Sequence, residues 1–273
     1  MNVSFIKTVY LGNLAFFVTD DFNANENYYR ELKNLIKIRR VNKHSFIRIG
    51  KPNDGGYIML DNFQKGGGIA YSFGIANDVS WDYDMVQRGY EIFMYDMTIN
   101  ALPFQHPNFH FFKQGIGGSK NEVEALDTLE NFIERNTHQN NQHMILKMDV
   151  EGAEWDFLTS VSSNTLNQFD QIVFEFHNIT QPKNSAQMEK TIEAFKKLNK
   201  THTPVHIHGN NHSSFLNIGG IGIFPNVPEI TYVKNENYEF EDDDEIFLPI
   251  PLDQPNHWKL KDIPLGYWNK FTS

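Results

Sequence analysis

The chain has 273 residues, of which 40% are hydrophobic and 14% aromatic, so it can bury one sizeable core and is typical of a globular protein. Its formal net charge of −10 argues against a general nucleic-acid binder, which needs a basic face for phosphate contacts. The sequence contains no cysteine, which excludes thiolate nucleophiles, cysteine-type zinc sites, iron–sulfur clusters and disulfides.

The first 22 residues contain apolar patches, such as residues 14–18, that are too short for a membrane span. No small-residue cleavage site follows a basic leader. We therefore expect a cytoplasmic protein without a membrane span.

Residues 27–40 predict a helix that ends in a basic run at residues 37–40. A loop rich in turn-forming residues follows at residues 48–57 and contains Asp54 and a pair of glycines. Loops of this composition can move and carry function, so we expect this one to close over a bound ligand.

A regular alternation of strand and helix begins at residue 69. Short apolar runs typical of buried strands alternate with helical patterns, which predicts a parallel sheet covered on both faces. The expected strands are residues 69–73, 91–95, 109–113, 144–148 and 171–176, and the expected helices are residues 79–88, 122–135, 154–161 and 185–199.

The last third of the chain has a different pattern. Strand-like runs at residues 205–208, 220–224 and 229–233 have no convincing helix between them and predict an antiparallel end to the sheet. The acidic run at residues 239–245 predicts a solvated loop. We divide the chain into an N-terminal helical or loop extension, a core and an irregular C-terminal tail packed on the core, at residues 1–68, 69–234 and 235–273.

A glycine turn follows the first strand of the alternation. Gly74 allows the backbone to turn tightly and to approach a ligand, although Ala76 stands where a second glycine is common. The next strand ends at Asp96, 22 residues after the glycine (96 − 74), where a carboxylate can bind both ribose hydroxyls of an adenosine cofactor. The alternative is that Asp96 is only a turn residue before Thr98.

The third strand is followed by Gln114 and Gly115 in a glycine-rich stretch. These residues either supply small groups and a polar side chain beside an adenine ring or simply form a loop. Both interpretations stay open at the level of sequence.

Residues 146–155 are the most informative segment. A buried-strand pattern stops at Asp149, and Glu151, a glycine turn and a helix start follow. Ligands and catalytic groups collect at this position in open α/β sheets. Two carboxylates there cost solvation energy unless a cation, a hydroxyl or backbone N–H groups satisfy them. The structural alternative is that Asp149 caps the next helix and Glu151 lies in solvent.

These motifs make the chain resemble the FkbM-type methyltransferases, a branch of the class I S-adenosylmethionine-dependent enzymes. The resemblance rests on residues 54–57, 71–75, 95–96, 146–154 and 208–211. It implies a Rossmann-like α/β fold with a seven-stranded, mostly parallel sheet, an antiparallel last strand and helices on both faces. It also implies S-adenosyl-L-methionine as the cofactor, and the expected cofactor-binding residues are Gly74, Asp78, Asp96, Met97, Gln114, Gly115 and Asp149.

Methyl transfer to a hydroxyl requires an acceptor oxygen that is positioned and partly deprotonated. Acids and imidazoles stand at three expected strand ends, and mixed ligands of this kind suit Mg²⁺ or Mn²⁺, which lower the pKa of a bound hydroxyl. The expected metal ligands are Asp149, Glu175, His177 and His208. In a metal-free alternative, His177 or His208 is the general base. In a structural alternative, the histidines are satisfied neighbours of the sheet end.

The predicted function is O-methylation of a sugar or another polyol, including nucleotide-linked sugars, with assistance from a divalent metal. The predicted catalytic residues are Asp149, His177 and His208, and the predicted partner is a small-molecule acceptor rather than a nucleic acid. One alternative is a nicotinamide-dependent oxidoreductase, which uses a similar glycine turn and ribose acid but needs the full phosphate-binding glycine pattern. Another is a non-catalytic carbohydrate-binding protein that has kept the fold.

Overall fold

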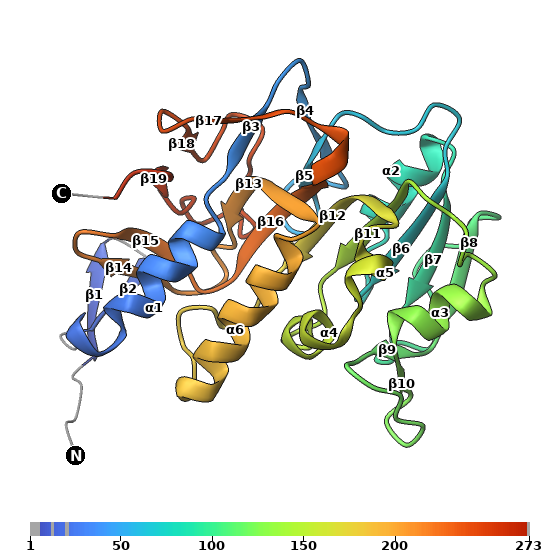
Figure 1. Cartoon of the computed structure of the whole chain (residues 1–273), viewed down its shortest axis with the longest axis horizontal. Helices are drawn as coiled ribbons and strands as arrows, with labels where there is room; N and C mark the ends of the chain where they lie inside the picture. Colours follow the sequence, from blue (N-terminus) through green and yellow to red (C-terminus); the bar gives the residue numbers. More distant parts are fainter. Residues whose placement is uncertain (1–5, 12–13, 20–21, 272–273) are drawn as a thin grey trace.

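The computed structural model describes residues 6–11, 14–19 and 22–271. A seven-stranded sheet forms its centre, in the order β13-β16-β12-β11-β6-β7-β8 (Figure 1). The strands are β6 (Ile69–Phe73), β7 (Glu91–Tyr95), β8 (Phe109–Phe112), β11 (Met144–Met148), β12 (Phe169–Glu175), β13 (His202–Gly209) and β16 (Pro228–Lys234).

Neighbouring strands of this sheet are parallel except at β16, which runs antiparallel to both β12 and β13. The predicted α/β fold, with a mostly parallel seven-stranded sheet and an antiparallel last strand, is confirmed. The run at residues 220–224 is not part of this sheet. It overlaps β15 (Gly222–Pro225), which belongs to a separate four-stranded sheet with β1 (Ile6–Leu11), β2 (Leu14–Thr19) and β14 (Phe215–Ile218).

Helices cover both faces of the central sheet, as Figure 1 shows. One face packs against α1 (Phe22–Leu35), α3 (Leu129–Arg135), α4 (Glu154–Ser160), α5 (Ser163–Leu166) and α6 (Ser185–Leu198). The other face packs against α2 (Ser80–Gln87) and a hairpin formed by β4 (Phe46–Ile49) and β5 (Tyr57–Leu60).

Alternation along each strand decides which side chains reach which face. On β11, Leu146 and Met148 join the core beneath α4 and α6, whereas Ile145 joins the core beneath α2 and the hairpin. On β12, Phe174 points to the first face and Val173 to the second. Lys147, Asp149 and Glu175 therefore belong to the side covered by α2 and the β4–β5 hairpin.

The predicted helix at residues 27–40 ends too late. Helix α1 stops at Leu35, and the basic run continues into β3 (Arg39–Val41), which pairs with β17 (Phe240–Asp242) of the acidic run. Lys37 lies 3.2 Å from Asp244, and Arg39 lies 3.2 Å from Asp242. Residues 240–242 of the acidic run therefore form a paired strand, which was not predicted, because the pairing joins segments far apart in the sequence. The remaining residues form no strand, and most of the run is exposed to solvent, as predicted.

The predicted helix at residues 122–135 begins too early. Helix α3 starts after Thr128, whose hydroxyl accepts a hydrogen bond from the N–H of Asn131 at 3.3 Å and so caps the helix. The residues before it form a turn and the short strand β10 (Leu126–Asp127), which pairs with β9 (Gly115–Ile116).

The C-terminal stretch is mostly irregular and lies against the core. It contains η1 (Asn235–Asn237), β18 (Phe247–Leu248) and β19 (Gly266–Tyr267). Trp268 is buried, and its indole N–H donates to the carbonyl of Ile36 at 2.9 Å.

None of the helices in the described ranges has the length and apolar character needed to cross a membrane. The domain boundaries at residues 68 and 234 stay a prediction, and the first 68 residues contain strands as well as a helix.

Candidate active site

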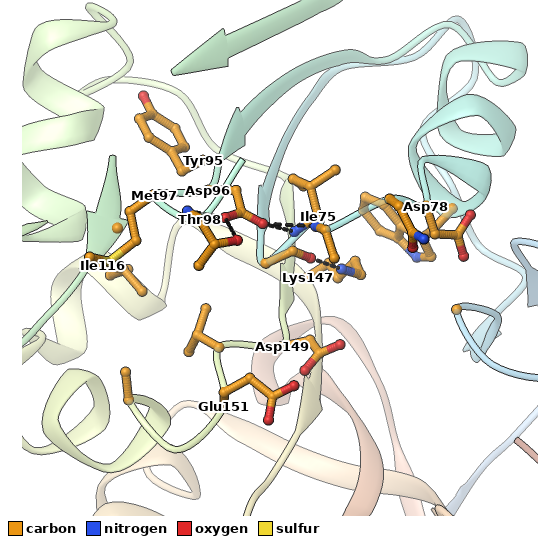
Figure 2. A pocket seen from close by; sticks show the side chains of 18 of the residues that line it. Ile75, Asp78, Tyr95, Asp96, Met97, Thr98, Ile116, Lys147, Asp149 and Glu151 are labelled. Carbon is orange, nitrogen blue, oxygen red and sulfur yellow. Dashed lines mark hydrogen bonds between the residues drawn. The ribbon is translucent and has the colours of Figure 1, made fainter. Parts of the chain in front are cut away.

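A cavity of about 370 Å³ opens at the carboxyl ends of β6, β7 and β11 (Figure 2). A volume of this size is typical of small-molecule sites. Of the predicted cofactor residues, Gly74, Asp78, Asp96, Met97, Gly115 and Asp149 line it. Gln114 is not among the lining residues, because its side-chain carbonyl accepts a hydrogen bond from Arg135 at 2.6 Å.

The turn at Gly74 has no room for a side chain. Its φ is +77°, and a Cβ atom would lie 1.6 Å from the carbonyl oxygen of Asp149. The Gly74 carbonyl accepts a hydrogen bond from Nζ of Lys147 at 2.7 Å, which Figure 2 shows as a dashed line. Glycine at this position therefore allows the end of β6 to pack directly against the end of β11.

Asp96 organises the same turn from the end of β7. Its Oδ2 accepts hydrogen bonds from the N–H groups of Ile75 and Ala76, both at 2.8 Å. Its Oδ1 accepts from the N–H of Thr98 at 2.7 Å and from the hydroxyl of Thr98 at 2.6 Å. Burial alone would raise the pKa of Asp96, but these hydrogen bonds hold it below its ordinary value. Asp96 therefore stabilises the turn. A ribose bound there has to share the carboxylate of Asp96 with these four donors.

The cavity has an apolar wall and a charged end. Met97, Ile116 and Leu126 contribute the apolar wall. At the charged end, Nζ of Lys51 lies 2.9 Å from Oδ2 of Asp78.

The loop predicted at residues 48–57 is the turn of the β4–β5 hairpin. Four residues of this range, Lys51, Asp54, Gly55 and Tyr57, line the cavity. The N–H of Gly50 donates to Asp84 of α2 at 2.8 Å, which fixes one end of the turn. The loop lies where a closing segment would lie, and its movement stays a prediction.

Acids and an imidazole gather beside this cavity. Asp149, Glu151 and His177 each offer a ligand atom, and these atoms all lie within 4.8 Å of one another. Nε2 of His177 lies 3.3 Å from Glu151 and 3.9 Å from Asp149. Glu175 is close as well, with Oε1 at 3.7 Å from the same nitrogen. Figure 2 shows Asp149 and Glu151 on the opposite side of the opening from Asp96.

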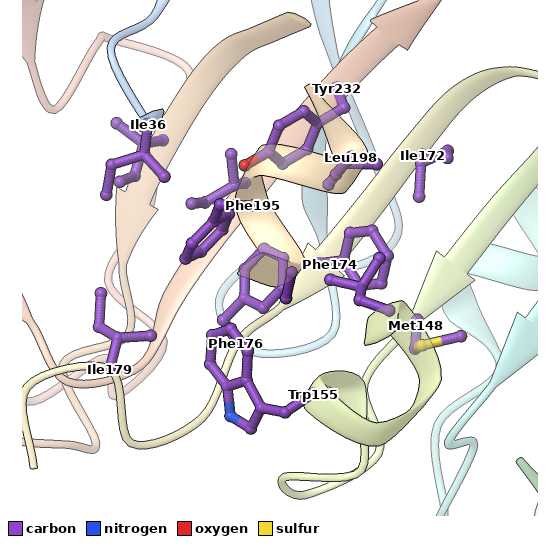
Figure 3. Close-up of a cluster of buried hydrophobic side chains, with 14 of the residues drawn as sticks. Ile36, Met148, Trp155, Ile172, Phe174, Phe176, Ile179, Phe195, Leu198 and Tyr232 are labelled. Atoms are coloured by element: carbon purple, nitrogen blue, oxygen red, sulfur yellow. The ribbon is translucent and has the colours of Figure 1, made fainter. Parts of the chain in front are cut away.

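Glu154 fixes the orientation of His177. Its Oε1 accepts a hydrogen bond from Nδ1 of His177 at 3.0 Å and another from the N–H of Val150 at 3.1 Å. The indole of Trp155 donates to the His177 carbonyl at 3.0 Å and stacks on Phe176, within the apolar cluster of Figure 3. The packing of α4 on β12 therefore holds the backbone and the ring of His177 together.

Glu154 was not predicted as a site residue. In the sequence it is an acid in the first turn of a helix, where a carboxylate is favoured by the helix dipole alone. Tyr57 was also missed, and its hydroxyl donates to Oδ2 of Asp149 at 3.3 Å. The only available signal was their place in the motifs around residues 54–57 and 146–154.

Burial and neighbouring negative charges shift the pKa values of this cluster. Burial raises the pKa of Asp149 to about 6, with Lys147 and His177 acting against the shift and Glu151 adding to it. The pKa of Glu175 is well above its ordinary value because of burial and then because of Asp149 and other nearby acids. Burial by itself would lower the pKa of His177, but the hydrogen bond and charge of Glu154, followed by the other acids, raise it.

His208 lies outside this cluster. Its Nδ1 donates to Glu229 at 3.0 Å and its Nε2 to Asp262 at 2.9 Å, so both ring nitrogens are engaged. The two carboxylates outweigh burial and raise its pKa to about 10. The predicted convergence of His177 and His208 assumed neighbouring strands, but β16 is inserted between β12 and β13. His206 is likewise engaged, 3.2 Å from Asp253.

A second cavity, of about 300 Å³, adjoins the first and shares Asp54, Asp149 and Glu151 with it. Its remaining lining residues are Glu175, His177, Asn210, His212, Ser213 and Val227. The acid–imidazole cluster therefore lies at the junction of two cavities, an arrangement that suits two bound molecules side by side.

A family model described as the methyltransferase FkbM domain matches residues 21–201. No curated protein is significantly similar in sequence to the chain.

Several solved structures are distantly similar, and three of them are described here. One, from Streptococcus thermophilus and named as a candidate hemolysin, is 14% identical over 66% of this chain and 71% of that chain, with a TM-score of 0.36. A candidate methyltransferase from an antibiotic biosynthesis pathway of Anabaena variabilis is 12% identical over 54% and 61%, with a TM-score of 0.30. A SAM-dependent methyltransferase from Agrobacterium tumefaciens is 8% identical over 86% and 72%, with a TM-score of 0.33. These TM-scores are too low to carry an argument.

Proposed function

The chain belongs to the FkbM methyltransferases, and on that premise we propose that it methylates a hydroxyl of a sugar or similar polyol with the help of a divalent metal. One observation carries the proposal. The ligand atoms of Asp149, Glu151 and His177 lie within 4.8 Å of one another, beside the cavity formed around Gly74 and Asp96. Family membership favours methyl transfer over the nicotinamide-dependent and the non-catalytic alternatives.

The first cavity is the proposed site of S-adenosylmethionine, which supplies an electrophilic methyl group when it is bound. The Gly74 turn, where a Cβ would meet the Asp149 carbonyl, lets backbone approach a ligand closely. The apolar wall of Ile116 and Leu126 suits the flat adenine ring of the cofactor. The Lys51–Asp78 pair offers one positive and one negative charge to the amino-acid end of the cofactor. Asp96 and Thr98, which are hydrogen-bonded to each other, form a polar part of the cavity wall.

The second cavity is the proposed acceptor site. Asp149, Glu151 and His177 would hold Mg²⁺ or Mn²⁺, and such an ion supplies Lewis acidity that lowers the pKa of a hydroxyl. Glu154 keeps Nε2 of His177 directed at the carboxylates, because its own carboxylate accepts the hydrogen bond from Nδ1. The hydrogen bond from Tyr57 orients the carboxylate of Asp149.

A metal explains this set of residues better than a lone histidine base does. Carboxylates placed together repel unless a cation is present, and this repulsion adds to burial, the main cause of the raised pKa values of Asp149 and Glu175. A general base at His177 would need only Glu154 as its partner. Glu151 and Glu175, at 3.3 and 3.7 Å from Nε2, would then serve no purpose.

The test is a transfer assay with S-adenosylmethionine labelled in its methyl group and a panel of sugars and polyols. We expect a labelled product whose methyl group is attached to oxygen, identified by mass spectrometry and NMR. The Asp149→Asn variant should give no product while it still binds S-adenosylhomocysteine. Labelled methyl on nitrogen or carbon alone, or no transfer to any panel member, would contradict the proposal.

A further inference from the structure

The second cavity has a strongly one-sided charge. Four carboxyl groups line it, from Asp54, Asp149, Glu151 and Glu175. Among its described lining residues there is no lysine and no arginine, and the only basic side chains are His177 and His212. An acceptor that enters this cavity therefore meets acids on several sides.

Two lysines of the first cavity and Arg48 of β4 already have partners. Lys51 pairs with Asp78 at 2.9 Å, and Lys147 donates to the Gly74 carbonyl at 2.7 Å. Arg48 donates to the carbonyls of Lys51 and Asn53. None of the three lines the second cavity, so they do not supply the positive charge that an anionic acceptor would need.

A divalent ion would not balance all four carboxylates. Its two charges would match those of Asp149 and Glu151, which leaves Asp54 and Glu175. The hydrogen bonds to these two come from neutral amides, since Asn210 donates to Glu175 at 3.0 Å and Asn256 donates to Asp54 at 3.4 Å. His177 also lies 3.7 Å from Glu175, but its Nε2 is assigned to the metal. Glu175 is also nine-tenths buried, with 6% of its surface exposed, so solvent screens its charge poorly.

A second observation shows that the cavity is shaped for a ligand rather than simply acidic. His177 is 8% exposed, and Glu154 holds it by Nδ1. Its Nε2 faces the cavity and makes no hydrogen bond among the described residues, although three carboxylates surround it. A buried and oriented polar atom of this kind indicates a binding partner.

We propose that the acceptor is an amino-bearing polyol, in which an ammonium group next to the methylated hydroxyl is bound by Glu175 and Asp54. Phosphate is excluded from this part of the acceptor, so a nucleotide-linked sugar would have to keep its diphosphate outside the cavity. The proposal rests on the function proposed above and specifies the substrate class of that site.

The test compares three probes that share a hexose ring and differ in charge: D-glucosamine, D-glucose and D-glucose 6-phosphate. Binding is measured by saturation-transfer NMR, with Mg²⁺ and S-adenosylhomocysteine present. We expect D-glucosamine to bind at least about tenfold more tightly than D-glucose, as charge-assisted hydrogen bonds allow. D-glucose 6-phosphate should bind more weakly than both.

Two variants locate the effect. Glu175→Gln should bring the glucosamine-to-glucose ratio close to one and leave the affinity for S-adenosylhomocysteine unchanged, which also reports on folding. Glu189→Gln, an exposed change on α6, should keep the wild-type ratio. Equal binding of glucosamine and glucose, tighter binding of the phosphate, or no binding of glucosamine would overturn the proposal. Methyl transfer to a neutral polyol without an amine preference would overturn this inference alone and leave the proposed function intact.

Discussion

Nδ1 of His177 lies 3.0 Å from Oε1 of Glu154, a carboxylate with no exposed surface. The same oxygen accepts the N–H of Val150, so Glu154 joins the segment after β11 to the segment after β12. A histidine whose Nδ1–H donates to a carboxylate has its tautomer fixed, with Nε2 free to bind a metal or a proton. The orientation of the proposed metal site therefore depends on a helix residue that does not line it.

Replacing Glu154 with Gln should weaken metal binding at His177. The amide keeps the size of the side chain but removes its charge, and changes of this kind cost roughly 10- to 100-fold in metal affinity. Metal binding needs the neutral imidazole, so in the wild type it should strengthen as the pH rises through the raised pKa of His177. The variant lowers that pKa, and the midpoint should move to lower pH. Mn²⁺ titrations across pH, with Glu189→Gln as the control, measure both effects; unchanged affinity and midpoint would remove Glu154 from this role.

Replacing Gly74 with Ala should damage both folding and cofactor binding. The new Cβ would lie 1.6 Å from a backbone oxygen that cannot move aside, and φ is +77°. Gly66 is the matched control, because its φ is +89° and nothing lies within 4 Å of its Cβ position. Gly66→Ala should cost about 1–2 kcal/mol, the conformational penalty alone. Gly74→Ala should cost clearly more in urea unfolding, and equal costs would show that the close approach to Asp149 is unimportant.

Replacing Asp96 with Ala should loosen the turn that shapes the cavity. The change leaves the N–H groups of Ile75 and Ala76 without their acceptor, which costs about 1–3 kcal/mol, and it should reduce the affinity for S-adenosylhomocysteine at least about tenfold. Because the folded pKa lies below the ordinary value of 3.8, the stability from ionised Asp96 is present above that pH and is lost as the pH falls further. Calorimetry and acid unfolding test these points, with the exposed Asp61→Ala as the control. Wild-type affinity and acid stability in the variant would contradict them.

His208 should stabilise the fold in a pH-dependent way. Its folded pKa of about 10 lies above the ordinary 6.5, so its contribution is complete below pH 6.5 and is lost as the pH rises toward 10. Through Asp262 it also ties the C-terminal stretch to β13. Denaturant unfolding at several pH values between 6 and 10 should show a decline in the wild type that is smaller in His208→Gln. Parallel curves for the two proteins would mean that the ion pairs contribute nothing.

The central strands were predictable because their apolar runs are short, separated by helical patterns and placed at regular intervals. The strands at residues 69–73, 91–95 and 144–148 match residue for residue. The β4–β5 hairpin was not predicted, since Arg48 to Tyr57 reads as a loop and the pairing of β4 with β5 depends on burial against the sheet. The pairing of β3 with β17 joins segments about 200 residues apart, which no local pattern reveals.

The site was predictable only in part. Strand ends locate Gly74, Asp96, Asp149 and His177 near one edge, because parallel strands bring their carboxyl ends together. The order of the strands in the sheet is set by tertiary structure and cannot be derived from local sequence. The insertion of β16 separates His208 from His177. The partnership of Glu154 with His177 depends on how α4 packs on β12, so it too could not be derived from spacing.

The most direct test of the central claim is the dependence of methyl transfer on metal. Purified protein is treated with EDTA, assayed with labelled S-adenosylmethionine and the best acceptor of the panel, and then supplied with Mg²⁺ or Mn²⁺. We expect EDTA to abolish turnover and either ion to restore it. Asp149→Asn should be inactive under all conditions while it still binds S-adenosylhomocysteine. Full turnover in excess EDTA, with no metal detected in the protein, would contradict the metal site and leave His177 as the general base.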